Sequence, residues 1–141
     1  MSKPELTPAA IDSFIAEVYP AAGKSFTCEA VGPAHAVARW KYSETLLRPG
    51  GFISGPTLFT AADVALWFLS FTQLGLEAMA VTSDLHIDFL RPAKGGDLLA
   101  RADLLRSGKS RITGRVSIWI DGNEDKPVAH ATGSYALLKV G

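Results

Sequence analysis

Cysteine is nearly absent from this chain of 141 residues, since Cys28 is the single one. One cysteine can form neither an intrachain disulfide nor a multi-cysteine metal site. Net charge is also missing, because 14 Lys and Arg balance 14 Asp and Glu. Nucleic-acid-binding proteins normally carry a basic surplus, so we expect no nucleic-acid partner. The three histidines (His35, His86 and His130) are far apart and lack HExxH spacing, so we expect no metal site.

Targeting and membrane signals are also lacking. The first 14 residues contain no apolar signal core. The most apolar stretch, 58–74, has 17 residues and includes five polar ones, so it is short and polar for a membrane span. We therefore expect a cytoplasmic protein without a membrane partner. At this length the chain should form one domain with its own core.

The chain begins with a helical pattern and continues mainly with strand patterns. Thr7 suits an N-cap and Pro8 suits a first helical position, and apolar residues then recur at helical spacing. The Pro- and Gly-rich stretch 46–55 predicts a loop. Alternating apolar and polar residues predict strands at 25–31, 35–42, 81–89, 97–106, 111–120 and 127–138.

One long helix is predicted from Pro56 to Leu74, with Gly75 as its C-terminal cap. Apolar side chains cover almost its whole circumference, which is typical of a buried helix. A buried helix followed by consecutive hairpin strands indicates an α+β fold. We expect an antiparallel sheet wrapped around this central helix, with residues 1–24 as an N-terminal helical extension.

Asp63 lies inside this helix and is the single charged side chain between Pro49 and Leu76. A buried carboxylate is unfavourable by several kcal/mol unless it is paired or solvated. Two interpretations follow from the residues alone. Asp63 pairs with an arginine from another segment or faces solvent, or it acts as a general base.

Ser54-Gly55-Pro56 starts the same helix. The first backbone N–H groups of a helix lack internal partners and favour developing negative charge. Gly55 would let a substrate carbonyl approach the backbone. An ordinary helix start is the alternative.

Basic residues concentrate in 91–115. The segment contains seven Lys and Arg and two Asp, which is a surplus of five positive charges in a protein of zero net charge. A phosphate-bearing ligand would explain the surplus, and solvated strand faces would explain it equally well.

Four segments together resemble the hotdog-fold acyl-CoA thioesterases of the phenylacetic-acid-degradation (PaaI-like) type. The resemblance covers about residues 35–139. It is carried by GGFISGPTLFTAADVALWF at 50–68, AVTSDLHIDFLRPAKGGD at 80–97, SGKSRITGRVSI at 107–118 and PVAHATGSYALL at 127–138.

The resemblance implies hydrolysis of an acyl-CoA to free acid and coenzyme A, without a further cofactor. Asp63 matches the catalytic carboxylate, as general base or nucleophile, and Gly55 matches the backbone N–H donor to the carbonyl. Thr82 matches a hydroxyl residue that approaches from the partner subunit. The family's sites lie at dimer interfaces, and dimers often pair into tetramers. The candidate substrate-binding residues are Ser54, Thr82, Lys109 and Arg111, the last two for coenzyme A phosphates.

An open sheet edge is an association liability, so we expect a homodimer or homotetramer, with strand 81–90 as the dimer edge. Two positions depart from the family pattern. Ser54 stands where many members have the His of His-Gly-Gly, and Arg48 stands near their upstream Asn. A non-catalytic acyl-CoA-binding hotdog module is the alternative function. A hotdog dehydratase is a third option, but the His-containing hydratase motif is missing.

Overall fold

The computed structural model describes residues 5–22 and 24–138. Residues 1–4 and 23 of the expected N-terminal extension lie outside the described residues. The elements in chain order are α1 (Pro8–Val18), η1 (Pro20–Ala22), β1 (Phe26–Gly32), β2 (His35–Trp40), η2 (Glu44–Leu46), β3 (Leu47–Arg48), β4 (Phe52–Ile53), α2 (Gly55–Leu74), β5 (Ala80–Phe89), β6 (Leu98–Ser107), β7 (Arg111–Ile120) and β8 (Ala129–Leu137).

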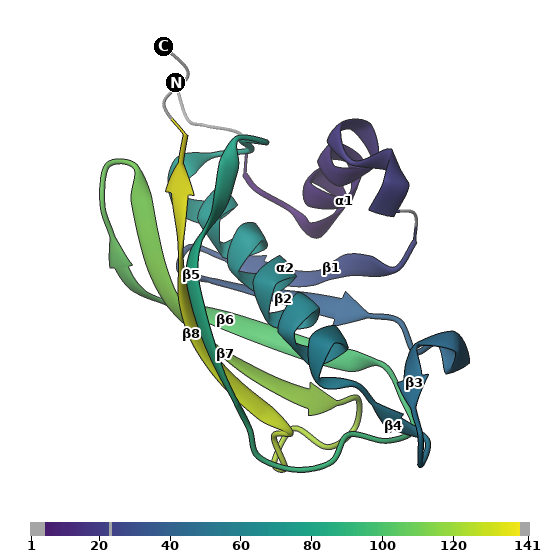
Figure 1. The fold of residues 1–141 in the computed structure, drawn as a ribbon. Coiled ribbons are helices and arrows are strands. Elements are labelled where there is room, and N and C mark those ends of the chain that lie inside the picture. The colour runs from purple at the N-terminus through teal and green to yellow at the C-terminus, as the bar shows by residue number, and fades with distance from the viewer. Residues whose placement is uncertain (1–4, 23, 139–141) are drawn as a thin grey trace.

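A six-stranded sheet with the order β1-β2-β6-β7-β8-β5 curves around α2 (Figure 1), and each neighbouring pair is antiparallel. The predicted α+β hotdog fold is therefore confirmed. The N-terminal helix is confirmed too, since Thr7 Oγ1 accepts a hydrogen bond of 3.1 Å from the N–H of Ala10 at the start of α1.

The centre of α2 lies close to the sheet because two small residues face it. Gly114 and Gly133 are register partners on β7 and β8. A Cβ atom at Gly114 would lie 2.5 Å from the Leu69 side chain, and one at Gly133 would lie 2.9 Å from that of Leu66. By length and composition α2 could cross a membrane, but 61% of its most apolar window is buried inside this fold.

The stretch 46–55 contains more order than the predicted loop. Its Gly50-Gly51 turn, with both residues at positive φ, joins β3 and β4 in a short hairpin. The Ile53 N–H then donates to the Ala93 carbonyl at 2.8 Å, which fixes the start of α2 beside the chain that follows β5.

Cys28 is a buried free thiol on β1. Burial, together with the nearby Asp12 carboxylate, raises the pKa of this thiol to about 12. It therefore stays protonated at neutral pH.

β5 is an edge strand of the sheet. One side of β5 pairs with β8, and the other side has no strand beside it among the described residues. Val81, Phe89 and the following Leu90 remain well exposed there. The segment 81–90 is therefore at an edge of the sheet, and its use as the dimer edge stays a prediction.

Candidate active site

The Asp63 carboxylate receives two hydrogen bonds from hydroxyl groups of the sheet. Thr82 Oγ1 on β5 donates to Oδ1 at 2.6 Å, and the Tyr135 hydroxyl on β8 is 2.8 Å from the same oxygen. The Tyr135 hydroxyl also lies 3.1 Å from the Asp63 carbonyl oxygen. Asp63 is half-buried, and no salt bridge to it is found in 5–22 and 24–138. The alternative in which Asp63 pairs with an arginine therefore finds no such partner in that part of the chain.

A β-bulge turns Thr82 toward Asp63. Strict alternation along 81–89 would put Thr82 on the same face as Asp84. The register instead shifts between these two residues, so that Thr82 pairs with Tyr135 and Asp84 pairs with Ser134. Cross-strand partners share a face of the sheet, so Thr82 faces α2 with Tyr135. The resemblance had implied that Thr82 comes from a partner subunit, whereas this contact lies within one chain.

Tyr135 was not predicted from the sequence. Its side chain is only 4% exposed. Burial, and secondly the negative charge of Asp63, raise the pKa of the Tyr135 phenol well above its usual range. The phenol therefore remains a neutral hydrogen-bond donor at physiological pH. A buried tyrosine hydroxyl usually needs a partner, but no spacing pattern in the sequence identifies Asp63 as that partner.

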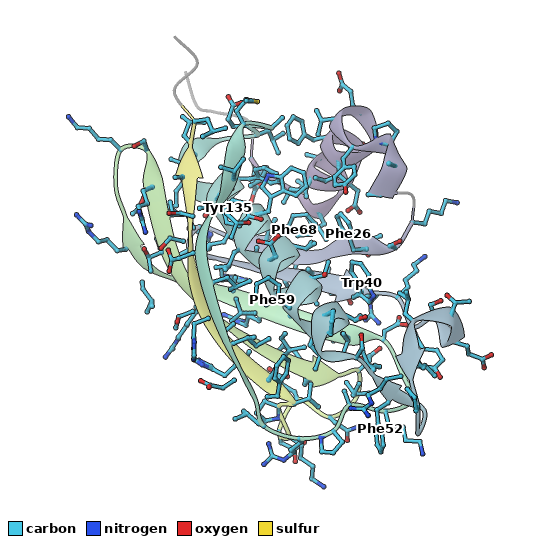
Figure 2. The ribbon with its side chains drawn as sticks, viewed as in Figure 1. Phe26, Trp40, Phe52, Phe59, Phe68 and Tyr135 are labelled. Atoms are coloured by element: carbon cyan, nitrogen blue, oxygen red, sulfur yellow. The ribbon has the colours of Figure 1, made fainter. Side chains whose placement is uncertain are left out.

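Asp63 opens onto a cavity of about 330 Å³, which we call the Asp63 cavity. Four large aromatic side chains line it besides Tyr135, namely Tyr19, Phe26, Trp40 and Trp67. In Figure 2, Phe26 and Trp40, which come from β1 and β2, lie to the right of Tyr135. The wall of the cavity is therefore largely apolar, and the carboxylate is its charged group.

Gly55 lies at the first position of α2. Ser54 caps the helix, since its hydroxyl accepts from the Thr57 N–H at 3.3 Å and contacts Thr57 Oγ1 at 3.0 Å. No hydrogen bond from the Gly55 N–H to another described residue is found. A Cβ atom at Gly55 would lie 3.3 Å from the ring of Phe89. The N–H is therefore free to donate to a ligand.

Gly55 lines a second cavity, of about 570 Å³, which we call the Gly55 cavity. Arg48, Phe52, Phe89 and Arg91 contribute to it, and it has no lining residue in common with the Asp63 cavity. In Figure 2, Phe52 lies near the lower end of the molecule, well away from Tyr135.

The two cavities lie too far apart in one chain to hold a single carbonyl group. Eight residues of α-helix separate Gly55 from Asp63 by about 12 Å. The Gly55 N–H also points out of the helix N-terminus, away from Asp63. A base acts within about 3 Å of the reacting water, and an oxyanion lies about 3 Å from its donor. Asp63 and Gly55 of one chain therefore do not meet at the same carbonyl group.

Lys109 and Arg111 are not brought to either cavity of their own chain. Lys109 is exposed in the turn between β6 and β7. Arg111 Nη2 lies 3.0 Å from Asp84 Oδ1 on the outer face of the sheet, and both side chains are more than half exposed. As for metals, the described part of the chain contains no group of three or more His, Cys, Asp or Glu side chains that could hold an ion.

Comparison with known proteins agrees with this fold. Residues 50–126 match the family model described as Thioesterase superfamily. A Saccharolobus solfataricus protein provisionally named an esterase is 30% identical over 72% of this chain and 65% of its own length. The chain thus covers less than two thirds of that relative.

Solved structures extend the likeness to nearly the whole chain. A provisionally named thioesterase from Silicibacter sp. TM1040 has a TM-score of 0.86 and 33% identity, over 97% of this chain and 95% of its own. A variant of the phenylacetic acid degradation protein PaaI from Thermus thermophilus has a TM-score of 0.69 and 26% identity, over 90% of this chain and 100% of its own. This chain belongs to the Thioesterase superfamily, as a hotdog protein of the PaaI-like type.

Proposed function

We propose that this protein hydrolyses acyl-CoA thioesters at a site shared by two copies of the chain. The observation that carries the proposal is the Asp63 carboxylate, which is held by hydroxyl donors and faces an apolar cavity without a cationic partner in the described residues. Such a carboxylate is available to accept a proton.

The second copy would supply the oxyanion donor. If two β5 edges pair antiparallel about a two-fold axis, the Thr82 end of one strand lies beside the Phe89 end of the other. Thr82 contacts Asp63 in its own chain, and Phe89 lies against Gly55 in its own chain. The pairing therefore brings Asp63 of one copy toward Gly55 of the other. A site shared in this way would make the dimer the functional unit, alone or within a tetramer.

The reaction would proceed by addition and elimination. A water adds to the thioester carbonyl carbon while Asp63 accepts its proton, and the carbonyl oxygen becomes an oxyanion that accepts from the Gly55 N–H of the other copy. The carbon–sulfur bond then breaks, and the leaving thiolate takes up the proton that Asp63 had accepted, which restores the carboxylate. The products are the free acid and coenzyme A. Attack by Asp63 itself is the alternative, and it would form a transient anhydride.

Each end of the substrate has a candidate subsite. The acyl group would occupy the Asp63 cavity, whose aromatic wall suits an apolar chain or ring. Ser54 would act at the substrate site by capping the helix turn that presents Gly55. For the phosphates of coenzyme A we retain Lys109 and Arg111. The two-fold pairing would bring the β6–β7 turn, which carries these two residues, toward Arg91 beside the Gly55 cavity of the second copy.

Thiol release measured across a panel of acyl-CoAs, with short, long and aromatic acyl groups, tests the proposal. We expect turnover of at least one member, and loss of that turnover in Asp63→Asn. Saturable binding without turnover of any member would contradict the proposal and favour the acyl-CoA-binding module.

A further inference from the structure

We infer that Tyr135 is a positioning residue that holds Oδ1 of Asp63, so that Oδ2 is the oxygen that accepts the proton of the attacking water. This inference rests on the proposed role of Asp63 as general base. It adds a residue to the site and distinguishes the two oxygens of the carboxylate.

The asymmetry of the contacts carries the inference. Both hydroxyl donors, Thr82 at 2.6 Å and Tyr135 at 2.8 Å, meet Oδ1, and Oδ2 accepts no hydrogen bond from a described residue. An oxygen that already accepts two hydrogen bonds has fewer free lone pairs and is a weaker base toward the proton of a water molecule. The free lone pairs of Oδ2 are therefore the better acceptor.

Tyr135 also fixes the direction of the carboxylate. Its hydroxyl lies 3.1 Å from the Asp63 carbonyl oxygen as well as 2.8 Å from Oδ1, so it contacts both the backbone and the side chain of one residue. The tyrosine side chain is packed in the core at 4% exposure. A rigid, buried donor such as Tyr135 limits rotation of the carboxylate. Thr82 would restrict this rotation less, because it is exposed to solvent on an edge strand.

Few ionisable groups share the surroundings of Asp63. Tyr135 from β8 and Tyr19, which follows α1, are the titratable side chains besides Asp63 in the lining of the Asp63 cavity, and no Lys, Arg, His or Glu is among its described lining residues. On β5, Asp84 lies on the opposite face beside Arg111. A pH effect of changing Tyr135 would therefore report on its contact with Asp63.

Tyr135→Phe removes the hydroxyl and keeps the ring. Because the carboxylate would lose a hydrogen bond that positions it and favours its charged form, we expect kcat to fall about tenfold and the acidic limb of the kcat–pH profile to move up by about one pH unit. KM should change little. Ser134→Ala is the matched control, because it removes another buried β8 hydroxyl, whose 2.8 Å contact is with Thr113 and not with Asp63. It should leave both kcat and the acidic limb unchanged.

The outcomes separate the inference from the function on which it rests. If Asp63→Asn keeps parent activity, the proposed function fails. If Asp63→Asn is inactive but folded Tyr135→Phe keeps the parent kcat and acidic limb, the positioning role is wrong. If Tyr135→Phe does not fold, a fluorinated tyrosine at position 135, a stronger donor, should move the acidic limb to lower pH. An unmoved limb in that protein would overturn the inference.

Discussion

Two carboxylates in this molecule are held in opposite ways. On the outer face of the sheet, Asp97 Oδ2 lies 3.1 Å from Arg39 Nη1, and Asp97 Oδ1 accepts from the Tyr42 N–H at 2.8 Å. Arg39 also binds Glu29 and Asp121. The Tyr42 N–H, and then Arg39, hold the pKa of Asp97 below its usual range.

Asp63, in contrast, contacts two neutral hydroxyl groups and borders a cavity. The outer carboxylates, those of Glu29, Asp97 and Asp121, balance the charge of the Arg39 guanidinium. They find their partners within the chain. The inner carboxylate has one oxygen without a partner in the described residues. Both carboxylates accept two hydrogen bonds, so the number of bonds does not distinguish the structural acid from the acid that we propose as the general base. The two acids differ in the nature of their donors and in the access to the second oxygen.

Replacing each acid by its amide should separate these roles most strongly. We expect Asp63→Asn to lower kcat by about 10²-fold or more without loss of the free energy of unfolding, because an uncompensated charge is removed. Asp97→Asn should leave kcat unchanged and lower the free energy of unfolding by about 1 kcal/mol. Steady-state kinetics and urea unfolding of both variants test this difference. A loss of stability in Asp63→Asn and not in Asp97→Asn would mean that Asp63 is the structural acid.

A smaller effect is expected from the cations of the β6–β7 turn. Replacing Lys109 and Arg111 together by Ala should raise KM for the best acyl-CoA about tenfold and change kcat less, because the contacts to phosphate precede the chemical step. The KM of the parent protein should rise with salt, which screens such contacts. A KM that is independent of ionic strength and of both substitutions would mean that the basic surplus is only solvated surface.

The outer ion cluster should show its own pH signature. The Arg39 guanidinium lowers the pKa of Glu29 below the ordinary 4.5, and the Tyr42 N–H and then Arg39 lower the pKa of Asp97 below the ordinary 3.8. A lowered folded-state pKa contributes stability above the unfolded value, and that stability is lost as pH falls. Because the side chains are partly exposed, we expect Arg39→Met to lower the free energy of unfolding by only about 1 kcal/mol at pH 7. Urea titrations should show this difference shrinking between about pH 5 and pH 3. An undiminished difference at pH 3 would exclude a charge effect.

Much of the fold follows directly from sequence patterns. The period of two in the strand segments, the Thr7-Pro8 helix start and the apolar circumference of 56–74 predicted the sheet, α1 and α2 in their observed places. The β3–β4 hairpin was missed because two-residue strands are too short to show alternation.

The site was less predictable. Asp63 stood out as a lone charge in an apolar helix, and Gly55 as a helix start. The partners of Asp63 did not stand out, because a bulge at Ser83 reverses the face that alternation assigns to Thr82. Tyr135 resembles an ordinary strand residue until the distance between β8 and α2 is known. The separation of the Asp63 and Gly55 cavities also depends on the three-dimensional structure, because spacing along the chain does not show where an N–H group points.

Mixing two inactive chains tests the shared site most directly. Gly55→Pro removes the N–H at a first helical position, where proline is tolerated, and the preceding Ser54 is already extended, with ψ 155°. Gly55→Ala is the control that keeps the N–H, since its Cβ would meet the exposed Phe89 ring at 3.3 Å.

Asp63→Asn alone and Gly55→Pro alone should each be inactive. When the two variants are co-refolded, we predict recovery of about a quarter of the parent activity, because half of the dimers then contain one intact shared site. A mixture as inactive as its components would contradict a site built from Asp63 of one copy and Gly55 of the other.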